Sequence, residues 1–272
     1  MVLSSVSVAI PVYDGSIKIP TFNKASWNFI KTAATSGEAS SYWSVGDRKE
    51  VILNGTVGDK VFSNTTTYCY ILGFDHNTSI ESNGEHTIHI GFGATALSGG
   101  NYIAYVDSQY DGYVSTTGYF SMNSSNTNKG GWKQCQMRTN ICPAFKNALP
   151  SDLKSVIRSV TKYQNQGGAS SAGESQDDEI FLMSKMEIFG QNKWGGYIDN
   201  QAQYDLYKDV ANGGYGASKV RCKDTSTSKA VFWWERSARS AFSDHFCYVA
   251  PSGSGTSNAA HGSYGFAPCL CL

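Results

Sequence analysis

The sequence predicts a loop-rich α+β fold with a few helices, preceded by a short β arm. Gly, Tyr, Ser, Asn and Thr are abundant, with 28 Gly and 16 Tyr, whereas only 16% of the residues are charged. Gly and Asn suit turns with positive φ, and Tyr and Thr suit half-buried strands. Several runs alternate between apolar and polar residues, and only a few segments have a helical spacing. A chain of 272 residues is also long enough to bury a large core.

The first 23 residues are predicted to form the β arm. Residues 6–12 place Val or Ile at every second position, Asp14-Gly15 predicts a turn, and Ile17 and Ile19 continue the alternation. This hairpin precedes the main part of the chain, so it is either a segment that docks onto a larger assembly or the first strands of the fold. Residues 24–272 are assigned to one domain, since no internal repeat or linker divides them.

Helices are predicted in three places. Ser26 can cap a helix that ends near Gly37. The clearest helical spacing covers residues 150–160, where apolar residues recur at i, i+3, i+4 and i+7: Leu153, Val156, Ile157 and Val160. A short helix is also expected within residues 201–210.

Strands are predicted where apolar and polar residues alternate or where a short apolar run is bounded by turn residues. These runs cover residues 42–55, 65–77, 86–93 and 230–234, and residues 178–190 are read as a buried strand that enters a structured turn. The segments between them are rich in Gly, Ser and Asn. We expect residues 99–129 to form a long surface excursion and residues 164–176 to form a flexible loop.

The composition excludes several classes of protein. The formal net charge is zero, so the chain lacks the basic surplus with which nucleic-acid-binding proteins neutralise phosphates. No run of about 18 apolar residues occurs, so we expect no membrane insertion. The first positive side chain is Lys18, and a secretory signal, which needs a basic start, is not expected.

The cysteine, histidine and carboxylate patterns predict no disulfide framework, no metal and no cofactor. The seven cysteines are an odd number, and Cys269 and Cys271 lack the spacing of a zinc ligand pair, so we expect free thiols. His86 and His89 lie on a predicted strand that would point their rings to opposite faces. The cluster at residues 177–179 is an alternative calcium site, but it lacks the spacing of a calcium-binding loop, and we interpret it as a solvated loop edge.

The end of the chain has an unusual composition. The last 35 residues contain no Lys, Glu, Gln, Met or Trp, although the preceding 237 residues contain 44 of them. An asparagine codon with a pyrimidine in third position cannot become a codon for any of these five residues when its adenines are changed. The bias therefore indicates diversification at adenines, with an ordinary Ser/Gly/Ala surface loop as the alternative.

This segment resembles the variable region of proteins that are diversified by retroelements of phages and bacteria. From about Ser26 onward the chain also resembles an uncharacterised domain common in gut-bacterial and phage proteins. The matching stretches, specific as an ordered set, are SYWSVGDRKEVILNG, ILGFDHN, GGWKQCQMR, ALPSDLKSVI, DEIFLMSKMEIFG, FWWERS and GFAPCLCL. Glu235 departs from the pattern, because leucine is usual at that place in the family.

The resemblance implies a C-type-lectin-like fold of the formylglycine-generating-enzyme type, related to phage major tropism determinants, with a variable region at about residues 236–268. It implies that Arg236 and Ser237 anchor this region through backbone hydrogen bonds. It implies a fixed aromatic and apolar scaffold made of Trp233, Trp234, Phe246, Val249, Phe266 and Pro268. The exposed positions between them would bind the ligand: Arg239, Ala241, Phe242, Asp244, His245, Tyr248, Ala250, Ser254, Thr256, Ser257, Asn258, Ala259, His261, Gly262 and Tyr264.

The implied function is host attachment by a receptor-binding protein of a phage tail, located in the virion. The expected partners are a host cell-surface receptor, protein or glycan, and other tail proteins held through the N-terminal arm. Relatives form trimers, so the resemblance also implies a homotrimer, although no heptad repeat supports it. Phe242, Tyr248 and Tyr264 are the best hot-spot candidates, and Asp244 and His245 would supply polar specificity.

Other functions stay open at this point. They are a variable adhesin on a bacterial surface, a carbohydrate-binding module, and a structural phage protein whose loop binds nothing specific. Formylglycine-generating enzymes share the implied fold and use reactive cysteines near the carboxy-terminus. Because no base or positive charge neighbours Cys269 and Cys271 in the sequence, we predict that the chain is not an enzyme.

Overall fold

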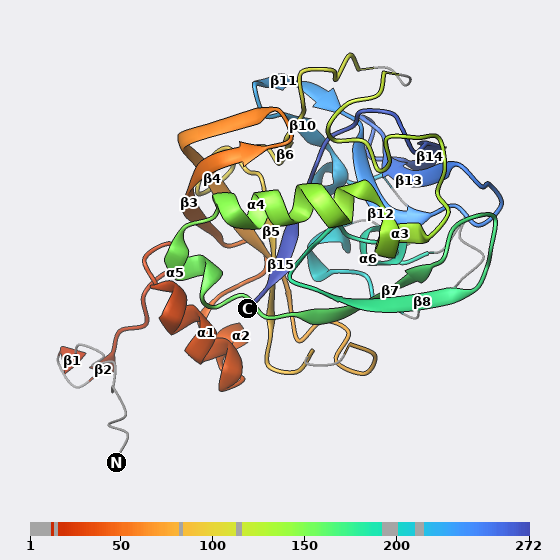
Figure 1. Cartoon of the computed structure of the whole chain (residues 1–272). Coiled ribbons are helices and arrows are strands. Elements are labelled where there is room, and N and C mark those ends of the chain that lie inside the picture. Colours follow the sequence, from red (N-terminus) through yellow and green to blue (C-terminus); the bar gives the residue numbers. More distant parts are fainter. Residues whose placement is uncertain (1–11, 14–15, 82–83, 113–115, 192–200, 210–214) are drawn as a thin grey trace, which may run out of the picture.

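The computed structural model describes residues 12–13, 16–81, 84–112, 116–191, 201–209 and 215–272, and its architecture is α+β, as predicted (Figure 1). The helices are α1 (Trp27–Thr35), α2 (Ala39–Tyr42), α3 (Gly131–Gln134), α4 (Cys142–Ala148), α5 (Ser151–Lys154) and α6 (Lys185–Phe189). A π-helical turn at Met137–Ile141 precedes α4, and 3-10 turns cover Asp205–Tyr207 and Ala217–Lys219. The strands are β1 (Val12–Tyr13), β2 (Ser16–Ile17), β3 (Arg48–Val57), β4 (Lys60–Phe74), β5 (Ile88–Phe92), β6 (Ile103–Ala104), β7 (Val160–Asn165), β8 (Gly173–Asp178), β9 (Ile180–Phe181), β10 (Arg221–Lys223), β11 (Ser226–Val231), β12 (Trp233–Ala238), β13 (His245–Val249), β14 (Gly255–Ala259) and β15 (Cys269–Cys271).

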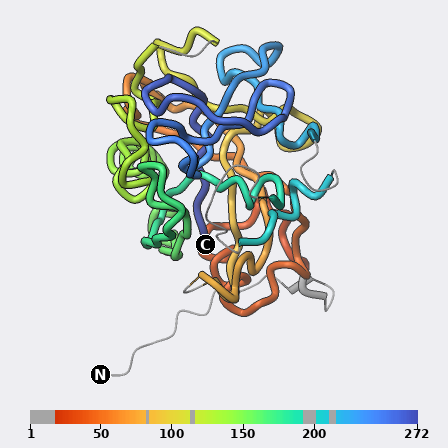
Figure 2. The backbone as a smooth tube through the Cα atoms, turned by 90° about the vertical axis from the view of Figure 1, so that its right-hand side faces the viewer, coloured from red at the N-terminus to blue at the C-terminus, as the bar shows by residue number. Residues whose placement is uncertain are grey.

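The largest sheet has the strand order β3-β4-β5-β15-β9, and all its neighbours are antiparallel. Its fourth member is β15, the last strand of the chain. Leu270 of β15 lies opposite Ile90 on one side and Ile180 on the other. Figure 2 shows this segment running from the upper part of the molecule into its centre, where the carboxy-terminus is marked.

The middle of this sheet, from the second half of β4 through β5 to β15, is buried on both faces, which explains why these strands read as apolar runs. By contrast, β3 and the first half of β4 alternate between buried and more exposed residues. Residues 69–72 of β4 are completely buried, and so is every residue of β5. Helix α4 packs on β3, and the ring of Phe145 in α4 lies 5.1 Å from that of Phe92 and 5.5 Å from that of Phe266. The core therefore joins the middle of the sheet to the end of the chain.

In the described residues, the first helix and the pairing of the arm strands are found as predicted, whereas the last residues assigned to the arm belong to the domain core. Helix α1 begins after Ser26, whose hydroxyl accepts a hydrogen bond from the Phe29 N–H at 3.2 Å. Strands β1 and β2 pair as the predicted hairpin, and residues 1–11 of the arm lie outside the described residues. Phe22 is buried, with its ring 5.5 Å from that of Trp43, so the last residues of the segment assigned to the arm pack into the domain core.

The helix predicted over residues 150–160 is wrong. Helix α5 ends at Lys154, and Val160 begins β7, which pairs with β8. Between them the Arg158 N–H donates to the carbonyl oxygen of Cys271 at 2.8 Å. Leu153, Val156 and Val160 are all buried, so their spacing reflects a segment enclosed by its surroundings and not one helical face.

Two segments expected to be irregular are ordered parts of the fold. Residues 99–129 are not a surface excursion. They contain β6, which pairs with β10, and Phe120 and Met122 are completely buried. Residues 164–176 are a loop only in part, because β7 and β8 form an antiparallel hairpin that pairs Asn165 with Gly173 and leaves residues 166–172 to connect the strands. In β6 and in the β7–β8 hairpin, strand pairing has overridden the local preference of glycine and serine for turns.

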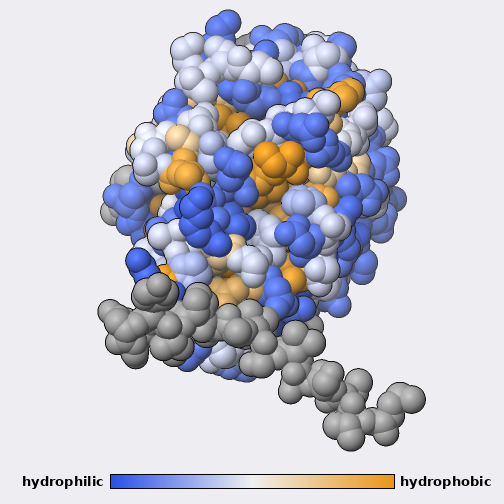
Figure 3. Space-filling view, turned by 90° about the vertical axis from the view of Figure 1, so that its left-hand side faces the viewer, coloured by the Kyte–Doolittle hydropathy of each residue, from blue (hydrophilic) through white to orange (hydrophobic). Residues whose placement is uncertain are grey.

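On the face shown in Figure 3, hydrophobic residues form separate patches among hydrophilic ones. The most exposed large apolar side chain in the described residues is that of Val61, at 71%. No helix in that part of the chain combines the length and apolar character needed to cross a membrane.

Candidate ligand-binding surface

The segment predicted to vary contributes most of a three-stranded antiparallel sheet in the order β12-β13-β14. The register shifts between Trp234 and Ala238, so β12 bulges where the segment begins. The predicted scaffold is confirmed as buried: Trp233, Trp234, Phe246, Val249, Phe266 and Pro268. The indole N–H of Trp234 donates to the carbonyl of Phe120 at 3.0 Å, which ties the sheet to the core.

Thirteen of the fifteen predicted ligand-binding residues are exposed or half-buried. Ala241 and Phe242 are exposed, and the half-buried ones are Arg239, Asp244, His245, Tyr248, Ala250, Ser254, Thr256, Ser257, Asn258, Ala259 and His261. The other two, Gly262 and Tyr264, are buried, so their predicted exposure is wrong. Gly262 forms a β-bridge with Thr117, and Tyr264 packs its ring 4.5 Å from that of Trp234.

The strand register divides these residues between the two faces of the sheet. Cross-strand partners point to the same side, and successive residues alternate. His245 is opposite Ala259, whereas Tyr248 is opposite Thr256, so these two pairs project to different sides. The candidate surface therefore consists of two clusters and not of one continuous face.

The first cluster, which we call the loop cluster, comprises Arg239, Phe242, Asp244, His245 and Ser257. The Arg239 guanidinium lies 4.0 Å from the centre of the Phe242 ring and donates to Ser257 Oγ at 2.8 Å. The Phe242 ring is 4.8 Å from that of His245, whose Nδ1 is 2.5 Å from Asp244 Oδ1. Phe242 is 39% exposed, so a large ring is held in place yet open to a ligand, as in many binding hot spots.

The second cluster is aromatic. Tyr248 and Phe232 are half-buried, with ring centres 5.4 Å apart, and both pack against the buried Tyr264. The Asn258 side-chain amide donates to the Tyr264 hydroxyl. Tyr264 thus supports Tyr248 from below and does not itself reach the surface.

Side chains from outside the variable region hold its backbone. The Asn128 amide nitrogen donates to the carbonyl oxygens of Arg239 (3.3 Å), Phe242 (2.8 Å) and His245 (2.7 Å). Its amide oxygen accepts from the Gly168 N–H at 2.7 Å, and its own N–H donates to the Ser243 carbonyl at 2.9 Å. Asn128 is completely buried. Backbone carbonyls exist at every residue type, so these bonds do not depend on the side chains of the loop.

The far end of the variable region is held in the same way. Ser121 Oγ donates to the His261 carbonyl at 2.7 Å, and the Asn123 N–H donates to the Ala260 carbonyl at 3.0 Å. At the start of the region, the Asn165 side chain donates to the Ala238 carbonyl at 2.5 Å. We call Ser121, Asn123, Asn128 and Asn165 the backbone cradle. Sequence reasoning missed it, because three of its members lie in the segment read as a surface excursion and none belongs to a motif.

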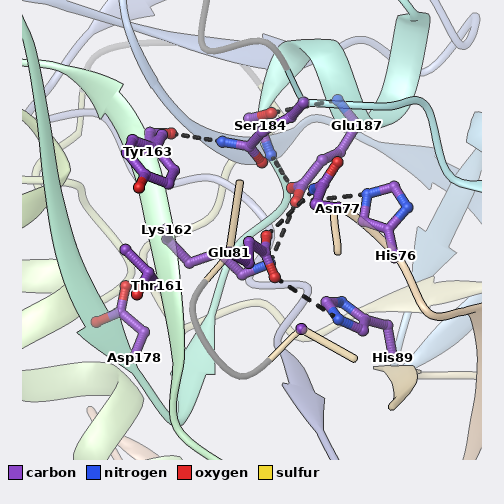
Figure 4. Close-up of polar contacts among 12 residues, drawn as sticks. His76, Asn77, Glu81, His89, Thr161, Lys162, Tyr163, Asp178, Ser184 and Glu187 are labelled. Carbon is purple, nitrogen blue, oxygen red and sulfur yellow. Dashed lines mark hydrogen bonds and ion pairs between the residues drawn. The ribbon is translucent and has the colours of Figure 1, made fainter. Parts of the chain in front are cut away.

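Below the sheet lies a buried network of charges (Figure 4). As predicted, Arg236 anchors its segment to the backbone, donating to the Leu182 carbonyl at 2.7 Å, and the Ser237 hydroxyl accepts from the Lys185 N–H at 2.9 Å. Arg236 also pairs with Glu187, which the sequence did not predict. Lys162 Nζ lies 2.7 Å from Glu81 and 3.3 Å from Glu187, and all four charged side chains are fully enclosed.

Proximity of opposite charges sets the ionisation in this network. Burial alone would raise the pKa of Glu187, but Arg236 and Lys162 together lower it to about 2. Burial lowers the pKa of His76 to about 3, so its imidazole is neutral. His89 Nδ1 is 2.8 Å from the Tyr204 hydroxyl, and the ring of His76 stacks on that of Tyr204 at 3.8 Å. Burial raises the pKa of Glu81, against the opposing effect of Lys162, and burial lowers the pKa of His89 well below its ordinary value. The network thus places two cations beside two carboxyl groups and two histidines.

Glu235 of β12 is a buried charged residue outside this network. It is completely buried, and neither carboxylate oxygen accepts a hydrogen bond within the described residues. Lys185 Nζ is 3.8 Å away. Burial raises the pKa of Glu235 to about 7, and Lys185 opposes this only in part. Glu235 is the residue at which the sequence departs from the resembled family.

The histidines and carboxylates considered as metal ligands do not form a metal site in the described part of the chain. Among the described residues, no three His, Cys, Asp or Glu side chains are arranged to hold a metal ion. At the Asp177-Asp178-Glu179 cluster, Asp178 is buried and accepts from Trp132 Nε1 at 2.7 Å and Arg138 Nε at 2.6 Å, so it is not a solvated edge. Glu179 pairs with Lys146 at 2.5 Å. Both carboxylates thus already have cationic or N–H partners.

The seven cysteines are free thiols, and six of them are buried. Burial raises the pKa values of Cys269 and Cys271 to about 12. Both therefore stay protonated at neutral pH, and a thiol reacts as a nucleophile through its thiolate.

One family model matches the chain. It is described as a domain of unknown function, DUF6273, and it covers residues 105–272, which include the cradle, the charge network from Lys162 onward and the whole variable region. No curated protein and no solved structure matches the chain.

Proposed function

We propose that this chain, which belongs to the DUF6273 family, is a receptor-binding protein that presents a diversified surface on a fixed scaffold. The fold we propose for the scaffold is C-type-lectin-like, of the formylglycine-generating-enzyme type. The observation that carries the proposal is the backbone cradle. It holds the loop through carbonyl groups, which leaves the side chains of the loop cluster replaceable.

The setting that best suits such a surface is a phage tail, where the chain would attach the virion to a host cell. Its partner there is a host cell-surface receptor, and the N-terminal arm joins it to other tail proteins. A homotrimer, or any array of several copies, would raise the avidity of a surface whose single-copy affinity is modest.

The state of the cysteines favours binding over catalysis. An enzyme of the formylglycine-generating type needs a reactive thiol. Cys269 and Cys271 lie on the central strand β15, completely enclosed, with pKa values far above neutral pH. Neither meets the requirement of an exposed thiolate.

Cell binding tests the proposal directly. The fluorescently labelled full chain is mixed with a panel of gut bacterial strains, and binding is measured by flow cytometry. A matched set of variants replaces Ala241, Phe242 and Ser257 by other residues that adenine mutagenesis of an asparagine codon can produce. We expect the set of strains bound to change while the melting temperature stays the same.

Two results would contradict the proposal. One is strain binding that is the same for every loop variant. The other comes from sibling genes: if their sequences differ evenly along the chain, and no template repeat or reverse transcriptase gene lies nearby, the surface is not diversified.

A further inference from the structure

A polar groove of about 700 Å³ adjoins the variable region. Its walls come from the segment before α3, from α3 itself and from the β7–β8 hairpin, and Ser243 is the one variable-region residue that lines it. The lining side chains that matter here are Asn126, Lys129, Gln134, Gln166 and Glu174. All five lie outside residues 236–268, so the groove is built mainly from the fixed part of the chain.

Close-packed backbone forms the floor of this groove. Gly130 and Gly131 at the start of α3, and Gly167 and Gly168 in the hairpin turn, all have positive φ, between 53° and 84°. A Cβ atom on Gly167 would lie 1.7 Å from the Asn128 carbonyl oxygen. Only glycine lets the two turns approach this closely. The groove therefore keeps its shape without support from a ligand.

The groove is continuous with the loop cluster. The Asn126 side-chain amide donates to Asp244 Oδ2 at 3.1 Å, and both Asn126 and Ser243, the neighbour of Asp244 in the chain, line the groove. Asn128, beneath, joins the Gly168 N–H of the hairpin turn to the Phe242 carbonyl of the loop. A ligand lying in the groove would thus reach the diversified side chains at its end.

The chemistry of the lining points to a saccharide. The exposed side-chain amides of Gln134 and Gln166 each offer a donor and an acceptor on neighbouring atoms, which matches vicinal hydroxyl groups. Lys129 and Glu174 cancel in charge, which disfavours a polyanion, and no aliphatic or aromatic side chain lines the groove to bury the apolar side chains of a peptide. We propose that this groove is a fixed saccharide-binding subsite of the receptor-binding surface. The inference rests on the proposed function and names part of its ligand.

The test uses the full chain and four soluble trisaccharides: maltotriose, cellotriose, triacetylchitotriose and sialyllactose. Binding is detected by saturation-transfer NMR and quantified by titration. The variant that combines Gln134→Ala with Gln166→Ala removes two exposed amides. We expect it to raise the Kd for the saccharide by about tenfold or more. Gln109→Ala, at an exposed glutamine outside the groove, is the matched control and should leave Kd unchanged.

The outcomes separate this inference from the proposed function. Loss of saccharide binding in the double variant but not in Phe242→Ala supports the subsite, even if no bacterial strain is bound. The subsite is wrong if none of the four trisaccharides binds or if the double variant binds as tightly as the parent chain. It is also wrong if an extended peptide occupies the groove and no saccharide displaces it.

Discussion

Arg236 and Arg239 are three residues apart and belong to two polar clusters of opposite character. Arg236 is completely buried and pairs with Glu187 in a network that also contains Lys162 and Glu81. Arg239 is half-buried and touches Phe242 and Ser257 of its own sheet. The buried charge network joins segments far apart in the sequence, whereas the loop cluster around Arg239 is made within residues 236–268.

The difference shows where this protein can change. Removing one partner from a buried charge network leaves another charge without compensation, which is among the most destabilising of substitutions. Removing one partner from an exposed cluster leaves a group that water can solvate. The boundary between positions that tolerate substitution poorly and positions that tolerate it well therefore falls at the end of β12, between residues 236 and 239.

Glu187→Gln would break the buried network and has the largest expected effect. Glutamine keeps the capping box with Ser184, so the change mainly removes the charge that balances Arg236 and Lys162. We expect a loss of about 3–5 kcal/mol in the free energy of unfolding, measured by urea denaturation. Asp205→Asn, which breaks an exposed pair with Lys208, should cost less than about 0.5 kcal/mol, and equal losses would show that the network is not compensated as described.

Glu235→Gln should change how the free energy of unfolding depends on pH, because it replaces a buried group that titrates. The pKa of Glu235 rises from its ordinary 4.5 to about 7 in the folded chain, so the folded state holds a proton that the unfolded state releases. The stability from this proton is full below pH 4.5 and is lost as pH rises to about 7, a change of roughly 3 kcal/mol. Because glutamine does not titrate, the variant should gain that amount relative to the parent between pH 4.5 and pH 8. Urea unfolding of both chains at the two pH values measures the gap, and a constant gap would contradict the prediction.

Asn128→Ala should release the loop while leaving the core folded. It removes the donors of three loop carbonyls and the acceptor of the Gly168 N–H, a loss of about 2 kcal/mol. We expect faster hydrogen exchange at residues 239–245, with little change in β4 and β5. Asn126→Ala, which removes one bond to the Asp244 side chain, is the control. Faster exchange throughout the chain would mean that Asn128 supports the whole fold and not the loop.

Phe242→Ala has the smallest expected effect on stability. Its ring is exposed and packs against Arg239 and His245 of the loop cluster, so the free energy of unfolding should change by less than about 0.5 kcal/mol, while cell binding falls. Phe246→Ala, four residues further on and completely buried, should cost about 3–5 kcal/mol. Thermal unfolding of the two variants compares them, and similar losses would place Phe242 in the scaffold.

Local signals account for what the sequence predicted correctly. Ser26 caps α1 within its own turn, and β3, β4 and β5 follow from alternation or from apolar runs. The aromatic scaffold was identified because large rings stand out from the small residues around them. Tyr264 is the exception. It was read as exposed because it lies among small polar residues, but Trp234 and Phe232 cover it from elsewhere in the chain.

What escaped prediction depends on partners distant in sequence. Asn128 contacts carbonyls more than 110 residues away, and a carbonyl leaves no mark on the amino-acid sequence. Lys162 meets Glu81 across 81 residues. Residues 156–160 have the spacing of a helix, yet they form part of a strand and a connection, because β8 and the last residues of the chain offer hydrogen bonds at those positions. The C-type-lectin-like topology came from resemblance and stays a proposal.

The position of β15 has a consequence for premature termination within residues 236–268. This strand lies between β5 and β9 in the largest sheet and follows the variable region in the chain. A premature stop codon anywhere in residues 236–268 would remove β15, which would leave β9 without its partner in this sheet and β5 paired only with β4. The core sheet is therefore completed only when translation continues in frame through residues 236–268 to β15.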